Sequence, residues 1–227
     1  MKDYHSQRFF SGDWLKAFKV NKVIRHFVLS DLVLFSGWGL INPIFSVFVI
    51  QNIPGATLVT VGIVSSIYWL IRALIQLPIA AFLDRTDGEK DDFYVLLSGL
   101  VLASIAAFSF TLVRSVPQLY LVQILHAIAF GLYAPAWSGI YNRHLDKGKI
   151  SFDLSLDSTV LALASGITGF LGGIVAQAFG FQFIFVAASI MASVAAVIIF
   201  LAPDLVFPRA KHARPTSPLN HTPRTTP

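Results

Sequence analysis

The chain has 227 residues, of which 55% are hydrophobic and only 13% are charged. Soluble domains average about 25% charged residues, so this composition argues against a soluble globular fold and against intrinsic disorder. The absence of cysteine excludes a disulfide scaffold and thiolate metal sites. We therefore expect an integral membrane protein that holds neither a cofactor nor a metal.

Six long apolar runs follow one another, each long enough to cross a hydrocarbon core of about 30 Å as a helix. The predicted spans of this all-α fold are 24-50, 57-83, 93-113, 117-142, 155-179 and 182-202. Together they form a transmembrane domain over 26-203. In the preceding segment 1-25, apolar side chains recur at helical spacing among lysines, which is typical of an interfacial amphipathic helix. The basic tail 204-227, rich in Pro and Thr, is predicted to be disordered.

Lysine and arginine are distributed unevenly about the predicted spans. Of the 17 basic residues, 15 lie in the terminal segments and in the loops after the second and fourth spans. By the positive-inside rule, both termini are cytoplasmic and the chain crosses the cell membrane (plasma or inner) several times. Contact with anionic lipid accounts for the net charge of +5, so we expect no nucleic-acid partner.

The first and fourth spans share a local pattern. Gly39-Leu40-Ile41-Asn42-Pro43-Ile44-Phe45-Ser46 aligns with Gly131-Leu132-Tyr133-Ala134-Pro135-Ala136-Trp137-Ser138, 92 residues later. The two spans run in opposite directions, so the pattern favours a 3+3 inverted repeat, an arrangement that many transporters use. The alternative is that both prolines are merely tolerated kinks.

The end of the second span carries a more specific motif. It reads Ala80-Ala81-Phe82-Leu83-Asp84-Arg85-Thr86-Asp87-Gly88-Glu89-Lys90, which resembles the Gly-x-x-x-Asp-Arg-x-Gly-Arg-Lys signature of the major facilitator superfamily. The glycines of the fifth span resemble the glycine-rich fifth helix of that family. The resemblance covers residues 20-203 and implies the N-terminal six-helix half of such a transporter.

The resemblance also implies a role for this loop as a cytoplasmic gate. Its gate residues are Asp84, Arg85, Gly88 and Lys90, and the alternative is a solvated turn. The sequence departs from the family pattern at Ala80, which replaces a Gly, and in one extra residue before Gly88. Gln123 stands where many proton-coupled members have an Arg.

Three ionisable side chains lie inside spans, where their cost makes each a functional candidate. Arg72, near the midplane, is a candidate contact for an anion, or else a structural Arg paired with Asp31 or with carbonyl groups. Asp31 could bind a cation or carry a proton, or be an interfacial acid paired with Arg25 or Arg72. His126 could titrate near physiological pH or be a neutral core His.

Further polar side chains complete a predicted pathway for substrate or ions. The predicted pathway residues are Asp31, Asn42, Arg72, Gln76, Gln123, His126 and Trp137. Small residues on the fifth span predict close helix packing, either against a second copy or within the chain. These packing residues are Ser165, Gly166, Gly169, Gly172 and Gly173.

The combined features predict a half-size secondary transporter that moves a small solute by alternating access as a homodimer or with a second six-helix half. The alternative is a non-transporting or truncated membrane scaffold that serves a partner subunit. No nucleotide-binding signature occurs, and the sixth span has no His to activate a serine, so we expect no enzyme and no catalytic residue. The predicted partners are the lipid bilayer, the solute and the second half.

Overall fold

The computed structural model describes residues 20–85 and 89–202, which form α-helices and one short 3-10 helix. The elements are α2 (Lys22–Ile41), α3 (Phe45–Asn52), α4 (Leu58–Leu83), α5 (Lys90–Ser109), η1 (Phe110–Leu112), α6 (Val116–Arg143), α7 (Ile150–Phe179) and α8 (Phe181–Phe200). Six segments in this part are long and apolar enough to span a membrane, α5 and η1 counting as one. The chain is therefore a multi-pass membrane protein. Most of the segment 1-25 and the whole tail 204-227 lie outside the described residues.

The first span, predicted as one helix over 24-50, is divided into α2 and α3 by a turn at residues 42–44. Pro43 has no backbone N–H to donate and crowds the preceding turn. The flanking N–H groups are satisfied locally, since Asn42 donates to the Trp38 carbonyl at 2.9 Å and Ile44 to the Ile41 carbonyl at 3.1 Å. The apolar run continues across this turn, which is why hydropathy alone did not reveal it.

The other helices differ from their predicted bounds mainly where the chain enters the bundle. The fifth span begins at Ile150 in the structure and not at 155, so that Asp153 belongs to α7. The third span begins at Lys90 and not at 93, which brings Asp92 into the first turn of α5. Acidic side chains in a first turn suit the positive end of the helix dipole.

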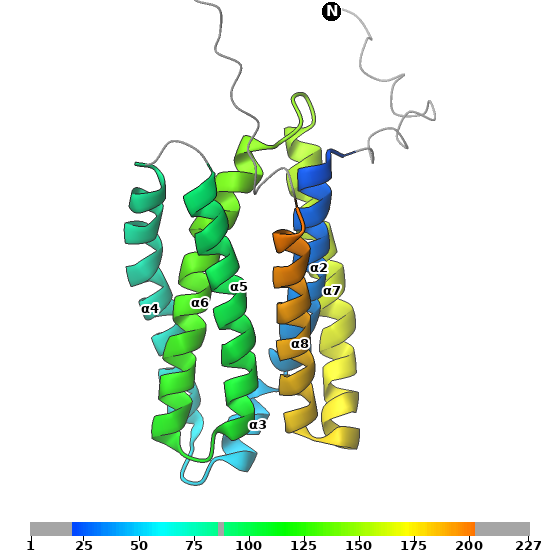
Figure 1. Ribbon diagram of the computed structural model, residues 1–227. Helices are drawn as coiled ribbons and strands as arrows, with labels where there is room; N and C mark the ends of the chain where they lie inside the picture. The colour runs from blue at the N-terminus through cyan, green and yellow to red at the C-terminus, as the bar shows by residue number, and fades with distance from the viewer. Residues whose placement is uncertain (1–19, 86–88, 203–227) are drawn as a thin grey trace, which may run out of the picture.

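The helices form two groups of three, with α4, α5 and α6 in one and α2, α7 and α8 in the other (Figure 1). In the first group α6 packs against α4 and α5, and in the second α2 packs against α7 and α8. The groups meet mainly along α5 and α8. Exchanging α2 with α6, α4 with α7 and α5 with α8 reproduces this set of contacts. Because α2 and α6 run in opposite directions, the fold is a 3+3 inverted repeat (Figure 1).

Close contacts at two glycines show the same repeat at atomic scale. A Cβ atom on Gly39 would lie 3.0 Å from the Ser165 Cα atom in α7. A Cβ atom on Gly131 would lie 3.6 Å from the Arg72 carbonyl oxygen in α4 and 3.0 Å from the Ile75 side chain. Ser165 and Arg72 are 93 residues apart, close to the 92 that separate the glycines. Each glycine thus lets the outer helix of its own group approach.

Two of the six spans are poorly covered by the rest of the chain. Only 11% of the most apolar window is buried in α4 and in α7, against 39% to 50% in the other four spans. In a membrane, such apolar surface faces lipid or another helical unit. α4 and α7 are also equivalent under the repeat, so each group leaves its outer helix uncovered.

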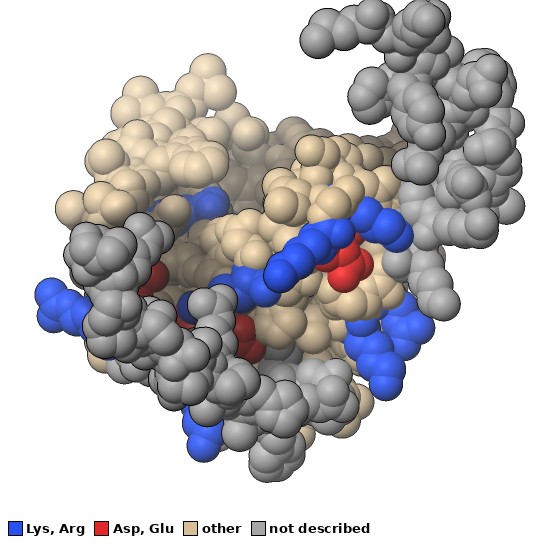
Figure 2. All heavy atoms as spheres, turned by 90° about the horizontal axis from the view of Figure 1, so that it is seen from above, with Lys and Arg blue, Asp and Glu red and all other residues tan. Residues whose placement is uncertain are grey.

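Charged side chains gather at one end of the bundle, which we call the basic end. α2, α5 and α7 begin there and α4, α6 and α8 end there (Figure 1). Figure 2 looks onto this end and shows Lys and Arg side chains with a few Asp and Glu among them. The assignment of this end to the cytoplasm remains a prediction from the positive-inside rule.

Candidate functional site

A cavity of about 460 Å³ lies between α2, α3, α4, η1 and α6. Most of its lining residues belong to the second half of α2 and the first halves of α4 and α6, which lie at the end of the bundle opposite the basic end (Figure 1). The size of the cavity falls within the range of small-molecule sites. The walls are mainly aromatic and aliphatic, with a few polar groups among them. The lining residues are Phe35, Trp38, Ile41, Asn42, Phe45, Ser46, Val61, Val64, Ser65, Tyr68, Trp69, Phe110, Gln123, His126 and Phe130.

His126 lies among several aromatic rings at this cavity. The Trp38 ring stacks on the imidazole with centroids 4.0 Å apart and planes 3° from parallel. Tyr68 lies 4.6 Å from the imidazole centroid, and Phe130 meets it edge-on at 5.2 Å. Such ring contacts fix the orientation of the imidazole because each neighbour comes from a rigid helix.

Three buried polar atoms at this cavity have no hydrogen-bond partner within the described residues: Trp38 Nε1, Gln123 Oε1 and His126 Nδ1. They supply one N–H donor, one carbonyl acceptor and one ring nitrogen that can play either role. Buried polar atoms are normally satisfied, so an unpartnered group of three at one cavity indicates a place where a polar ligand or water binds.

Arg72 lies one turn beyond the cavity on α4, near the middle of the span. Its Nη1 donates to the Tyr68 hydroxyl at 3.0 Å, and its guanidinium carbon lies 5.8 Å and 5.5 Å from the Tyr68 and Trp69 ring centroids. It does not pair with Asp31, as one reading of the sequence proposed. Gln76, half-buried, follows Arg72 on the next turn of α4.

Asp31 belongs to a second polar group, nearer the basic end. Its Oδ1 accepts a hydrogen bond from the Tyr133 hydroxyl of α6, and its other neighbours are Asp157 of α7 and Trp137. Both carboxyls are shielded from solvent, with Asp31 2% exposed and Asp157 6% exposed. Trp137 itself stacks on Tyr141 with centroids 4.4 Å apart. Of the predicted pathway residues, three therefore line the cavity (Asn42, Gln123 and His126), two follow it along α4 (Arg72 and Gln76), and two belong to this acid group (Asp31 and Trp137).

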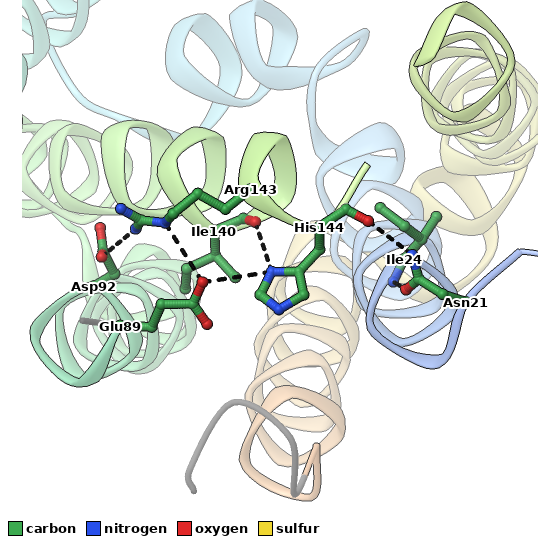
Figure 3. Close-up of polar contacts among 7 residues, drawn as sticks. All are labelled: Asn21, Ile24, Glu89, Asp92, Ile140, Arg143 and His144. Atoms are coloured by element: carbon green, nitrogen blue, oxygen red, sulfur yellow. Dashed lines mark hydrogen bonds and ion pairs between the residues drawn. The ribbon is translucent and has the colours of Figure 1, made fainter. Parts of the chain in front are cut away.

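A charged network joins α5 and α6 at the basic end (Figure 3). Arg143 Nη2 bonds to Asp92 Oδ2, and Arg143 Nε lies 3.5 Å from Glu89 Oε1. His144 Nδ1 lies 3.6 Å from the same Glu89 oxygen and 3.0 Å from the Ile140 carbonyl oxygen. The contacts fasten the α4–α5 connection to the end of α6.

The network continues to α2 through Asn21. Its side chain accepts from the Ile24 N–H at 2.9 Å, which caps α2, and donates to the His144 carbonyl at 2.7 Å (Figure 3). Asn21 Nδ2 also donates to Asp146 Oδ1 at 3.0 Å. The start of α2 is thereby tied to the α6–α7 connection.

The predicted gate residues lie beside this network. Asp84 caps the end of α4, where its N–H donates to the Ala80 carbonyl at 3.0 Å, and the exposed Arg85 follows. Lys90 begins α5, whereas Gly88 lies outside the described residues. Their role as a gate remains a prediction.

The small residues of α7 face two different surroundings. A Cβ atom on Gly172 would overlap the Leu40 carbonyl oxygen, and one on Gly169 would lie 3.4 Å from Pro43. Ser165 packs against Gly39. At Gly166 and Gly173, a Cβ atom would meet nothing within 4 Å among the described residues. Close packing within the chain thus uses part of this set, and the other part faces outward.

Sequence reasoning missed several members of these groups. Tyr133 and Trp38 were hidden among the many aromatic residues of the spans. Asp157 stands close to the predicted start of the fifth span and did not stand out as intramembrane. Arg143 reads as an ordinary loop cation. No sequence signal singled out Tyr133 as a partner of Asp31.

Comparison with known proteins agrees with the fold. A family model described as Major Facilitator Superfamily matches residues 27–225. An uncharacterized MFS-type transporter of Methanocaldococcus jannaschii is 23% identical over 176 residues, which cover 77% of this chain and 44% of the relative. The chain thus spans less than half the length of the relative that it matches. With its six-span inverted repeat, the chain belongs to the major facilitator superfamily.

Proposed function

We propose that the chain moves a small solute across the membrane by alternating access. The observation that carries this proposal is the cavity of about 460 Å³, three of whose lining residues each hold a buried polar atom without a partner among the described residues. A purely structural bundle gains nothing from such atoms, because an unsatisfied buried group costs about 1–3 kcal/mol. A solute that binds there would satisfy them for part of each transport cycle.

For such transport we propose that a second six-helix unit lies opposite this one. A second copy of the chain is our first candidate for this unit. The uncovered faces of α4 and α7 support this proposal, because they offer apolar surface on which another unit could pack. The open positions Gly166 and Gly173 allow a helix to approach α7 closely. A different six-helix half would use the same two helices.

We assign the predicted pathway residues two roles. Asn42, Gln123 and His126 line the cavity and are proposed to contact solute, with Arg72 and Gln76 one and two turns further along α4. Asp31, with Trp137 beside it, is proposed to couple transport to an ion or proton. It lies with Asp157 at the junction of α2, α6 and α7, which a rocking movement would disturb.

The basic-end network is proposed to stabilise one conformation of the transporter. Arg143 pairs with Glu89 and Asp92, which joins the end of α6 to the start of α5. Asp84 and Arg85 precede Glu89 by a few residues in the chain. Opening on this side would require such contacts to rearrange. The exposed Asp84 and Arg85 would then contact the second six-helix unit.

Uptake into proteoliposomes tests the function. The purified full chain is reconstituted, and uptake of radiolabelled solutes from four classes (a hexose, an amino acid, an aromatic carboxylate and an aromatic amine) is measured with and without a proton gradient. We expect at least one class to enter above protein-free vesicles. Arg72→Ala and Asp31→Asn should reduce that uptake at least about tenfold, since each removes a charge from the pathway.

Arg25→Gln is the matched control, because Arg25 is exposed near the start of α2 and should leave uptake unchanged. Folded, inserted protein that moves no solute of any class would contradict transport and favour the scaffold alternative. Undiminished uptake by both variants would remove Arg72 and Asp31 from the pathway.

A further inference from the structure

The charge of Arg72 has no carboxylate partner among the residues that the structure describes. Within the described part of the chain, its guanidinium donates a hydrogen bond to a neutral group, the Tyr68 hydroxyl, at 3.0 Å. A guanidinium in the middle of a span is costly unless an anion or a polar cavity faces it. The position therefore calls for a negative charge from outside the described bundle.

The buried carboxyl groups of Asp31 and Asp157 do not supply the negative charge for Arg72. Asp31 is engaged by the Tyr133 hydroxyl and has Asp157 beside it, so both carboxyls are placed among α2, α6 and α7. Arg72 projects from α4, the uncovered outer helix of the other group. The bundle thus keeps its buried acids and its intramembrane cation on separate helices.

The surroundings of Arg72 define the rest of the ligand. The rings of Tyr68 and Trp69, which lie 5.8 Å and 5.5 Å from the guanidinium carbon, also line the cavity. The His126 ring, which is stacked on Trp38 and lies 4.6 Å from the Tyr68 ring, belongs to the same aromatic group. A planar apolar body packs well among such rings, which line the cavity.

The sign of the charge discriminates between ligand classes. An organic cation would gain from the aromatic walls but would be repelled by Arg72, whose guanidinium carbon lies 5.8 Å and 5.5 Å from the centroids of the cavity-lining Tyr68 and Trp69 rings. A neutral aromatic solute would leave the guanidinium without a counter-ion. An anion satisfies both the charge and the planar donor fork of the guanidinium, which matches a carboxylate.

We propose that this site takes an amphipathic organic monoanion, with its planar apolar body in the cavity and its carboxylate at Arg72. The proposal rests on the proposed transport function and specifies its substrate class. The body fills the aromatic cavity, and Gln123 and Trp38 contact any polar groups that it carries. The site selects its solute by charge first and by planarity second.

Calorimetric titration of the purified full chain with three matched probes tests this class. The probes are 2-naphthoate, its neutral analogue 2-naphthamide and the cation 2-naphthylmethylammonium. We expect 2-naphthoate to bind at least about tenfold more tightly than either analogue, as a charge-assisted contact allows. Arg72→Gln should abolish this preference while amide binding persists, Arg72→Lys should retain part of it, and Arg25→Gln should leave it intact.

Equal or tighter binding of the amide or the ammonium by the wild-type chain would overturn the proposal, and so would the absence of naphthoate binding. The wild-type comparison decides even if Arg72→Gln fails to fold. Binding is independent of uptake, so the two proposals fail separately. Transport of a neutral or cationic solute would overturn the substrate class alone, and naphthoate binding without any flux would overturn transport alone.

Discussion

Some residues of the candidate site can be predicted from the sequence, and others cannot. Asp31, Arg72 and His126 are recognisable because ionisable groups are rare inside spans, and the structure places each beside a polar or aromatic partner. Tyr133 and Asp157 escape the same reasoning. Tyrosine is common in apolar spans, and an acid near a helix start reads as interfacial until tertiary packing covers it.

Two neighbouring glycines of α7 allow a matched test of the packing at this scale. Gly172→Ala places a methyl group against the Leu40 carbonyl oxygen with too little room, so α2 and α7 must separate. We expect a loss of about 1–3 kcal/mol in stability, as for other overpacking substitutions. Thermal denaturation in detergent measures it.

Gly173→Ala is the control, because its methyl group meets nothing within 4 Å among the described residues. The control should leave the melting temperature of the isolated chain unchanged. Equal destabilisation by both substitutions would contradict the assignment of one glycine to the chain interior and of the other to its surface.

The membrane-spanning helices were the most predictable elements, because a span needs about 20 apolar residues and little else. The exception is the first span, where Pro43 interrupts the helix although Pro78 and Pro135 do not interrupt theirs. Hydropathy does not predict this difference. Neighbouring helices and local acceptors for the freed N–H groups decide whether a proline bends a helix or ends it. The two-faced packing of α7 was likewise hidden, because small residues suit both faces.

The uncovered helices give a prediction about pairing. Gly62 of α4 and Gly173 of α7 are both open, and both lie toward the end opposite the basic end. If α4 of one copy packs on α7 of the other, Cys at both positions should form an intermolecular disulfide in membranes. The native chain has no cysteine, so every crosslink arises from the introduced pair.

The control pair is Val101→Cys with Val194→Cys, on exposed faces of α5 and α8. We expect dimers on a denaturing gel from the Gly62 and Gly173 pair and monomers from the control. Equal crosslinking by both pairs would indicate random collision, and monomers from both would contradict the homodimer while leaving a different second half as the partner.

The whole molecule consists of two inverted three-helix repeats. The eight-residue match between the first and fourth spans predicted the inverted repeat, and the contacts at Gly39 and Gly131 show it in three dimensions. Its two halves differ in chemistry, however, since α2 carries Asp31 where α6 carries Gln123. The sequence could not reveal the cavity between α2, α4 and α6, because a cavity depends on how distant helices pack.

The most direct test of the central claim is the access of water to the cavity from each side of the membrane. Ser65 lines the cavity on α4, and Ser65→Cys adds a small thiol there. A membrane-impermeant maleimide is applied to right-side-out and to inside-out vesicles, with Val101→Cys on the exposed face of α5 as the lipid-facing control. Alternating access predicts that the thiol at position 65 reacts from both sides and that the control reacts from neither. Reaction at position 65 from one side only, or from neither, would contradict the account.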